Sequence, residues 1–423
     1  MSFFDQCKQC SVMVDNGSGV FFQPMTEEYS YILTAKHNLY NDSVYGNYNN
    51  PKNIDEIKIN GNNNQIKNKY EHQTLDIAIL KIDKTEFESP YKEFKQPSDR
   101  DEFKFYGYPQ NRRGQAEQIK YFVLKVGHMS SYQIVADNEH YYDQNDVAGC
   151  SGGGVFKQAG NNFYLVGIEC RMDAESALEE NNMRLRFIFI EAFDEIIKEN
   201  ELTPLYPPYM GDFNSISEHV FLLNDYEEKR DFVRNRLKYL AKTYSKELTP
   251  VVIKNEFESE LFINGFDINN ITDSELWQMY LEFILLSIII ESKENITIDK
   301  IKEIYKKRKI LFAKADRWVD LKEEIVKSNL LGLQKNGTVF IACNGDRRPN
   351  KVQLSSNSII NIAQPPQLEE MRIDQGIDYS VDIKYKHIYA IEKLLLDSED
   401  KFSSATGSDI DEILKEVLQN VCQ

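Results

Sequence analysis

The chain has few of the features that mark membrane or secreted proteins. Its longest apolar run, residues 283–290, is too short to cross a bilayer and is interrupted by Ser287. Six cysteines among 423 residues do not make a dense disulfide framework. The first residues lack the basic and then apolar segments of a secretory signal, so we expect none. These absences favour a protein of the reducing cytoplasm with no membrane segment.

Positive charge is also scarce. The chain has 50 Lys and Arg against 67 Asp and Glu, a net charge of −17. A general nucleic-acid binder needs a positive surface to displace counterions, so we do not expect direct nucleic-acid binding. The basic run at residues 300–309 could contact DNA or an acidic partner. It could equally be the solvated face of a helix, which agrees better with the net charge.

The first half of the chain has the pattern of a β protein. Between about residues 10 and 190, short apolar runs such as 31–34 and 77–80 are separated by Gly, Asn and Pro. Regularly spaced short strands with turn residues between them are typical of a barrel or a sandwich.

Beyond a proline-rich segment at residues 203–210, the apolar period changes to that of helices. Thr272 and Glu275 have the spacing of a capping box, which predicts a helix that follows them. Residues 298–315 are a candidate basic helix, and the apolar positions of 410–418 form a helical stripe.

The second half also contains two strand-like runs, at residues 338–342 and 358–363. We therefore predict an α+β protein of more than one domain, because 423 residues exceed one ordinary core. The expected parts are a β domain at residues 1–200, a linker at 201–215, and a mainly helical domain with a small β insertion at 216–423.

Three short segments of the first half contain residue types used in nucleophilic catalysis. His37 ends the strand-like segment 33–37, and Asp76 directly precedes an apolar strand-like run. Ser151 lies within the glycine-rich segment 149–154. The residues follow one another along the chain in the order His, Asp, Ser.

These residue types fit one reaction. A serine hydroxyl is a weak nucleophile unless a neighbouring base takes its proton, and an imidazole can do so near neutral pH. A buried carboxylate fixes the imidazole tautomer and stabilises the imidazolium. Glycines beside the serine allow a tight turn whose amides, here those of Gly149 and Ser151, can bind a developing oxyanion. We therefore predict His37, Asp76 and Ser151 as a catalytic triad.

Each of the three segments also has a simpler interpretation when taken alone. His37 could be a structural histidine at the end of a strand, and Asp76 could cap a turn. Residues 149–154 could form an ordinary hairpin. The catalytic interpretation depends on the three occurring together, in this order and each in the expected local context.

The same segments resemble those of the trypsin/chymotrypsin family. Residues 34–37 are similar to its Thr-Ala-x-His motif, 76–80 to its Asp-Ile-Ala-Leu strand and 149–153 to its Gly-x-Ser-Gly-Gly turn. The resemblance covers about residues 8–200. It implies a chymotrypsin-like pair of packed six-stranded β-barrels, with the triad in the crevice between them. It also implies a serine endopeptidase that uses no cofactor and no metal.

The sequence departs from secreted trypsins at Cys150, where they carry the aspartate that pairs with a new N-terminus. No cleavage site for activation is visible, so the chain looks closer to intracellular bacterial relatives such as the high-temperature-requirement proteases, without their PDZ domain. Cys150 is a rival nucleophile, but the family pattern places that role on Ser151 and leaves Cys150 as a packed residue. Cys7 and Cys10 form a single CxxC motif with no second such motif, which leaves a zinc or redox role open.

In this family the floor of the primary substrate pocket lies a few residues before the serine. Asn145 and Asp146 occupy that stretch here, and Glu169 lies on the strand expected opposite. The resemblance therefore implies a pocket that favours a basic or polar substrate side chain. Alternatively, these carboxylates belong to surface loops.

The whole chain resembles the protease effector subunit of bacterial anti-phage ABC-three-component (Lamassu-type) systems. The resemblance implies that the domain at 216–423 docks partners, namely an SMC-like ATPase and a small third subunit. It also implies that these partners restrain a protease acting on proteins or peptides in the cytoplasm. The alternative is a catalytically silent trypsin-fold scaffold within a larger complex.

Overall fold

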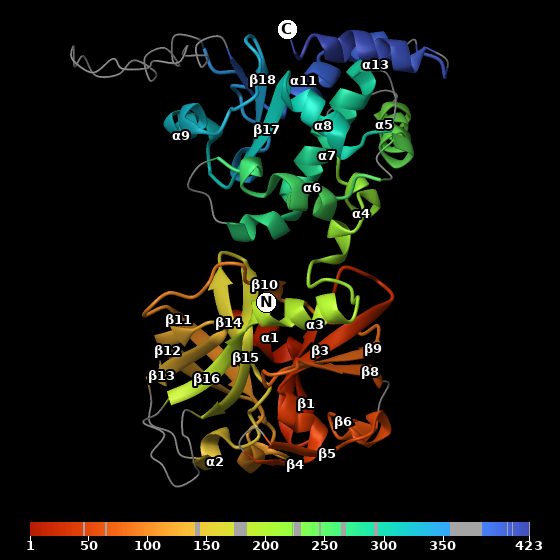
Figure 1. Cartoon of the computed structure of the whole chain (residues 1–423). Helices are drawn as coiled ribbons and strands as arrows, with labels where there is room; N and C mark the ends of the chain where they lie inside the picture. Colours follow the sequence, from red (N-terminus) through yellow and green to blue (C-terminus); the bar gives the residue numbers. More distant parts are fainter. Residues whose placement is uncertain are drawn as a thin grey trace, which may run out of the picture. The chain divides into compact units, whose positions relative to one another are not determined.

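The computed structural model describes most of the chain. The described residues are 1–44, 47–63, 66–139, 144–172, 184–221, 223, 230–244, 247–263, 268–291, 295–355, 383–403, 405–407 and 409–422. The predicted strand at 358–363 lies outside them. The chain divides into two compact units, Met1–Pro208 and Tyr209–Gln423, which are taken one at a time below (Figure 1).

The first sheet of unit 1 has seven strands in the order β7-β6-β1-β2-β3-β9-β8. Their bounds are β1 (Ser11–Val14), β2 (Gly17–Phe22), β3 (Tyr29–Thr34), β6 (Lys58–Ile59), β7 (Asn62–Asn63), β8 (Ile66–Glu71) and β9 (Ala78–Asp83). Tyr31 and Leu33 of β3 pack in one core, and Ile32 between them packs in another. Because side chains alternate along a strand, β3 is buried on both faces.

The second sheet closes on itself. Its order is β10-β15-β14-β11-β12-β13-β16, and β15 also pairs with β16, which completes a six-stranded barrel. The strands are β10 (Tyr91–Lys92), β11 (Glu102–Gly107), β12 (Lys120–Ser130), β13 (Gln133–Asn138), β14 (Gly154–Ala159), β15 (Asn162–Met172) and β16 (Arg184–Phe189). The predicted β architecture is thus confirmed. The first sheet, however, has seven strands, and within its described residues no pairing closes it.

Short helices and a ribbon complete unit 1. They are α1 (Phe3–Cys10), η1 (Lys36–Leu39), α2 (Gln144–Val147) and α3 (Phe193–Glu199), with the strand pair β4 (Tyr40–Val44) and β5 (Asn47–Pro51). Buried residues of β2 and β3 belong to the same core as the barrel interior, as Val20, Leu33 and Phe187 illustrate. The two sheets therefore pack on each other, and the strand ends between them can share one site.

Unit 2 is mainly helical with a small parallel sheet, as predicted. Its main helices are α5 (Arg230–Tyr244), α6 (Pro250–Phe257), α7 (Ser274–Glu291), α8 (Ile298–Tyr305), α9 (Lys322–Lys327), α11 (Ala390–Leu396), α12 (Glu399–Ser403) and α13 (Ile410–Gln419). The sheet has the order β17 (Arg308–Ala313), β18 (Thr338–Cys343) and β19 (Lys384–His387). Helix α7 is buried along most of its length and packs against α5, α13, β17 and β18.

Three local predictions for unit 2 can be compared with its structure. The C-terminal stripe forms α13, as expected. The predicted capping box names the wrong residue, because Asp273 accepts the Glu275 amide at 2.9 Å while the Thr272 hydroxyl donates to the Asn269 carbonyl oxygen. The helix expected over 298–315 ends at Tyr305, and its second half forms β17.

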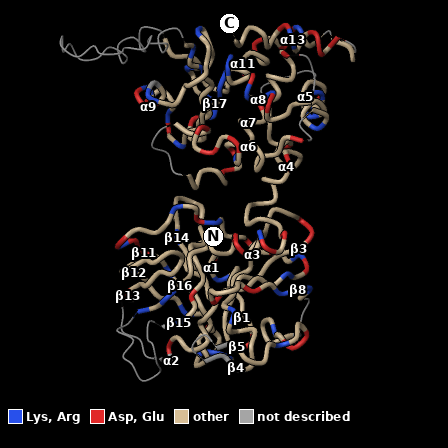
Figure 2. The backbone as a smooth tube through the Cα atoms, viewed as in Figure 1, with Lys and Arg blue, Asp and Glu red and all other residues tan. Residues whose placement is uncertain are grey.

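The basic run divides between α8 and β17, and neighbouring carboxylates bind most of it. Lys302 pairs with Glu256, and both Lys307 and Arg308 pair with Glu291. Lys and Arg residues lie among Asp and Glu in this unit (Figure 2). The charge of the run is therefore largely paired within the protein. In the described part of the chain, no helix has both the length and the apolar character needed to cross a bilayer.

Candidate active site

His37 and Asp76 are held together by two hydrogen bonds. His37 lies in η1, directly after β3, and Asp76 lies just before β9, which pairs with β3. The His37 Nδ1 atom is 2.7 Å from Asp76 Oδ2, and the His37 amide donates to Asp76 Oδ1 at 2.9 Å. Since the carboxylate takes the Nδ1–H, the lone pair of His37 stays on Nε2.

The surroundings of Asp76 favour its charged form. Burial alone would raise the pKa of this carboxyl, but hydrogen bonds and charge from His37, with a further hydrogen bond from the Tyr48 hydroxyl, outweigh burial. The pKa of Asp76 is therefore lowered, and the group is an anion at neutral pH. An anion here can stabilise an imidazolium at His37.

Ser151 lies in a tight turn, residues 148–153, that leads into β14. Gly149 and Gly152 both have φ of +91° there, in the left-handed region that favours glycine. A Cβ on Gly152 would also lie 2.1 Å from the Ser18 carbonyl oxygen. Glycine at 149 and 152 is therefore required by the backbone of this turn.

Every carbonyl from residue 148 to residue 151 accepts a hydrogen bond. The donors are Gln110 N to Ala148 O (2.7 Å), Ser18 Oγ to Gly149 O (2.9 Å), Gly153 N to Cys150 O (2.9 Å) and Ser18 N to Ser151 O (2.8 Å). Two of the turn's amides are also bonded, Cys150 N to Val147 O and Gly152 N to Glu169 O. Each peptide plane of the turn is therefore fixed in orientation.

The amides of Gly149 and Ser151 remain. Within the described residues, neither donates a hydrogen bond to a backbone or side-chain acceptor. Two free amide donors beside a serine hydroxyl can stabilise an oxyanion formed at that serine. The geometry is compatible with the predicted oxyanion hole at Gly149 and Ser151, whose role stays a prediction.

Ser18 of β2 joins the turn to the first sheet, and sequence reasoning missed it. Its amide and hydroxyl bind the carbonyls of Ser151 and Gly149, and its hydroxyl also accepts the Tyr108 amide at 2.9 Å. Its own carbonyl accepts the Thr34 hydroxyl at 2.7 Å. The only sequence signal is that Ser18 lies between two glycines, a pattern too common to be specific.

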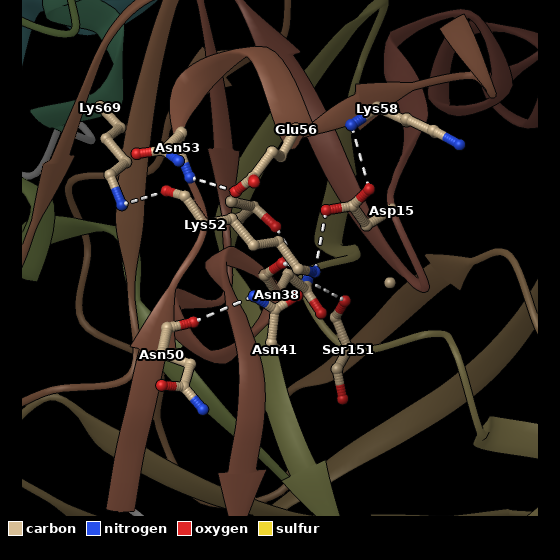
Figure 3. A network of polar contacts seen from close by, with 12 residues as sticks. Asp15, Asn38, Asn41, Asn50, Lys52, Asn53, Glu56, Lys58, Lys69 and Ser151 are labelled. Atoms are coloured by element: carbon tan, nitrogen blue, oxygen red, sulfur yellow. Dashed lines mark hydrogen bonds and ion pairs between the residues drawn. The ribbon is translucent and has the colours of Figure 1, made fainter. Parts of the chain in front are cut away.

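A polar network supports the same region (Figure 3). Asn38 donates to the Ser151 carbonyl oxygen at 2.9 Å, and Lys52 Nζ lies 3.1 Å from the Asn38 carbonyl oxygen and 2.9 Å from Asp15 Oδ2. Asp15 also accepts the Lys58 amide at 3.0 Å. These bonds connect the segment after β5 to the turn around Ser151.

His37 and Ser151 both line a cleft of about 630 Å³. The other lining residues are mostly polar: Asp15, Asn16, Asn38, Tyr40, Asn41, Lys52, Glu56, Lys58, Gly61, Gln110 and Gly149. A cleft of this size and polarity can admit a peptide segment whose backbone needs hydrogen-bond partners.

The Ser151 hydroxyl is turned toward β15 in this structure. Ser151 Oγ donates to the Cys170 carbonyl oxygen at 3.2 Å, and among the described residues no hydrogen bond joins it to His37. The Cys170 thiol in turn lies 3.4 Å from the Asp76 carbonyl oxygen. Cys170 therefore contacts both residues, although nothing in the sequence marked it.

The three predicted pocket residues have different surroundings. Asn145 lies in α2, and its side chain is outside the described part of the structure. Asp146 pairs with Lys120 at 2.7 Å. Glu169 is only 3% exposed, and burial, together with the charge of Asp76, raises its pKa to about 8. The ion pair with Lys120 and the raised pKa of Glu169 thus reduce the negative charge of this region. The preference for a basic or polar substrate side chain stays a prediction.

Three cysteines that the sequence raised as candidates are buried thiols. Cys150 is fully buried, and burial raises its pKa, so its reactive thiolate is disfavoured. This is the packed position that the family pattern predicts. Cys7 and Cys10 are fully buried as well, with raised pKa values. In the ranges that the structure describes, no group of three or more metal-ligating side chains occurs.

Each half of the chain matches the model of a known protein family. Residues 9–179 match the family model for trypsin, and residues 187–396 match the model for C-terminal domain 4 of the ABC-three component (ABC-3C) systems. The chain therefore carries a trypsin domain followed by a C-terminal domain of ABC-three component systems. No curated protein matches the chain.

Two solved structures are similar to part of the chain. One is kallikrein-related peptidase 10 in complex with Zn²⁺, at 12% identity and a TM-score of 0.32, covering 46% of this chain and 98% of that one. Another is Rv3671c from M. tuberculosis H37Rv in an inactive mutant form, at 10% identity and a TM-score of 0.31, covering 46% of this chain and 87% of that one.

Replacing Ser18 tests whether it holds the turn around Ser151. In Ser18→Ala, the Gly149 carbonyl and the Tyr108 amide both lose a partner, and we expect a loss of about 1–3 kcal/mol in the free energy of unfolding. Urea unfolding followed by circular dichroism measures this loss. Ser98→Ala, at an exposed position, is the control and should change stability by no more than about 0.5 kcal/mol. Equal losses in the two variants would contradict the role given to Ser18.

Asp76→Asn tests the electrostatic part of the site. An amide keeps the shape but removes the charge and can favour the wrong imidazole tautomer at His37. By comparison with other triads, we expect peptide hydrolysis to fall by about 10⁴-fold while the fold is retained. Steady-state kinetics with a peptide substrate, beside a thermal melt of the same sample, measures both. An unchanged rate would show that Asp76 does not act through His37.

Proposed function

Because the chain joins a trypsin domain to a C-terminal domain of ABC-three component systems, we propose that it is the protease effector of an anti-phage complex of this kind. In this proposal unit 1 is a serine endopeptidase that cleaves proteins or peptides, and unit 2 is the docking domain through which partners control it. The arrangement that supports the proposal best is the hydrogen bond between His37 and Asp76, together with the cleft that His37 lines with Ser151 and Gly149.

The proposed reaction uses the chain's own residues. Ser151 Oγ attacks the scissile carbonyl carbon while His37 Nε2 takes the hydroxyl proton. The carbonyl oxygen becomes an oxyanion that the amides of Gly149 and Ser151 bind. His37 then gives its proton to the leaving amine, and an acyl-enzyme remains.

Water completes the cycle by the same route. His37 takes a proton from water as it attacks the acyl carbonyl, and the proton returns to Ser151 as the ester bond breaks. Asp76 stays ionised throughout and stabilises the imidazolium of His37 at both stages. The reaction needs no cofactor and no metal in this proposal. Asn145, Asp146 and Glu169 are proposed to border the pocket for the substrate side chain, with a basic or polar preference.

Ser151→Ala is the direct test of the protease assignment. If the triad acts as a unit, turnover of a peptide substrate should fall by roughly 10⁶-fold, to the level left by binding and the oxyanion donors. A fluorophosphonate probe should label the wild-type chain and leave the variant unlabelled, with Ser98→Ala labelled like the wild type. Equal labelling of the wild type and Ser151→Ala would assign the nucleophile to another residue.

The ABC-three component domain supports a proposal about partners. We propose that an SMC-like ATPase and a small third subunit, as in Lamassu-type systems, bind unit 2 and restrain the protease in the cytoplasm. The free, mostly buried cysteines support a reducing location. The second candidate is a silent scaffold of trypsin fold, favoured only by the position of the Ser151 hydroxyl away from His37.

Co-expression with the products of the neighbouring genes separates these alternatives. We expect the chain and its Ser151→Ala variant to co-purify equally with such partners, because docking does not need the nucleophile. Labelling of Ser151 by the probe should be weaker in the complex than in the isolated chain. Failure to co-purify would remove the proposed restraint, and absence of labelling in both states would favour the scaffold.

A further inference from the structure

We propose that His72 is a positioning residue for Asp76, because its imidazole shapes the loop that presents the Asp76 carboxylate to His37. This inference rests on the proposed protease function. It adds a residue that does not line the cleft. Its effect is therefore expected on the rate of the reaction rather than on the binding of substrate.

Asp76 lies in the short loop between β8 and β9. The loop is closed at its base, where the His72 amide donates to the Ile77 carbonyl oxygen at 3.0 Å. Inside the loop, the amides of Thr74 and Leu75 both donate to His72 Nδ1, at 3.1 and 3.0 Å. Among the described residues these two amides have no other acceptor. The imidazole thus supplies the acceptor that a regular turn takes from the backbone.

The other ring nitrogen of His72 is bound to α3. Because Nδ1 accepts two N–H groups, the ring hydrogen lies on Nε2. His72 Nε2 is 2.9 Å from Glu195 Oε2 and donates to it. The next residue, Gln73, donates to the Glu199 side chain of the same helix at 3.2 Å. His72 is buried, so its ring is fixed in both orientation and tautomer.

The backbone of His72 contacts the segment that carries His37. Lys36 Nζ donates to the His72 carbonyl oxygen at 2.9 Å, and Lys36 is adjacent to His37 in η1. Three consecutive peptide planes, from His72 to Leu75, are therefore each held by a hydrogen bond. The chain continues from them directly into Asp76, which makes its two bonds to His37. A loop that loses the imidazole acceptor would shift these bonds, and a displacement of about 1 Å can cost roughly 100-fold in rate.

Two substitutions of His72 test the proposal on the full chain. His72→Phe keeps a buried ring but has no polar ring atom. Its kcat for a peptide substrate should fall by about 10- to 100-fold, with KM changed by less than about 2-fold. His72→Asn places a side-chain oxygen where it can accept amides two residues ahead, so its kcat should return to within about 5-fold of the wild type.

Glu195→Ala tests the bond to α3 and covers the case in which His72→Phe does not fold in a thermal melt. It truncates an exposed side chain and removes the acceptor of the ring hydrogen. We expect kcat to fall by about 3- to 10-fold, the loss of one ordinary hydrogen bond. The matched control is Glu191→Ala, at an exposed glutamate of η4 (Ile190–Ala192), which should keep the wild-type kcat. Equal kcat values in the two Glu→Ala variants would contradict the role of the bond to α3.

The same substitution in an Asp76→Asn chain shows whether His72 acts through Asp76. In that background His72→Phe should slow fluorophosphonate labelling by less than about 3-fold, because the interaction that it supports is already lost. A merely structural role predicts the same fractional loss in both backgrounds, and that result would overturn the proposal.

A measurement that needs no activity separates this inference from the protease function. The proton between His37 Nδ1 and Asp76 should give a far-downfield proton NMR signal that Asp76→Asn lacks. We expect His72→Asn to keep this signal and His72→Phe to lose or shift it. An unchanged signal or an unchanged kcat in His72→Phe rejects the positioning role. If the wild type neither cleaves peptides nor reacts with the probe, the protease function fails, and the NMR signal alone decides whether His72 positions Asp76.

Discussion

The rest of the site depends on the hydrogen bonds that Ser18 makes to the turn around Ser151. Ser18 stands on the first sheet of unit 1, and the turn leads into the barrel, so the two bonds join the two sheets at the site itself. The amides of Gly149 and Ser151 share peptide planes with the carbonyls of Ala148 and Cys150, which accept from Gln110 and Gly153. Ser18 fixes the peptide planes next to them, so the packing of the sheets and the turn's own hydrogen bonds together orient the segment that holds the predicted oxyanion donors.

The sequence was sufficient to predict those features for which the local apolar pattern and the chemistry of the residues agree. The β pattern of the first half, the helical period of the second, and the closeness of His37 to Asp76 could all be predicted, because apolar period and motif context determine them. Ser18, Asn38 and Cys170 could not be found, since their roles arise from contacts with residues that are distant in the sequence and that only the fold brings together. The missed strand β17 has a related cause: its basic residues Arg308 and Lys309 are buried and paired, so charge suggested a helix surface where the chain forms a strand of the sheet.

Asp76 and Glu169 show how one small region gives two carboxyls opposite properties. Both are largely removed from water, which alone would raise both pKa values. Asp76 receives hydrogen bonds from His37 and Tyr48 and stays charged, whereas Glu169 has no comparable donors and faces the charge of Asp76. The same small region therefore holds one carboxyl as an anion and the other mostly as a neutral acid at pH 7.

The separation of Ser18 from Gly149 along the chain means that the ribosome makes these two bonded residues many seconds apart. The two bonded residues are 131 positions apart, and at roughly 5–20 residues per second the ribosome takes on the order of 7–26 s to travel between them. The barrel closes only when β16, later still, pairs with both β13 and β15. A chain that lacks β16 therefore contains His37, Asp76 and Ser151 but cannot close the barrel that carries the turn around Ser151.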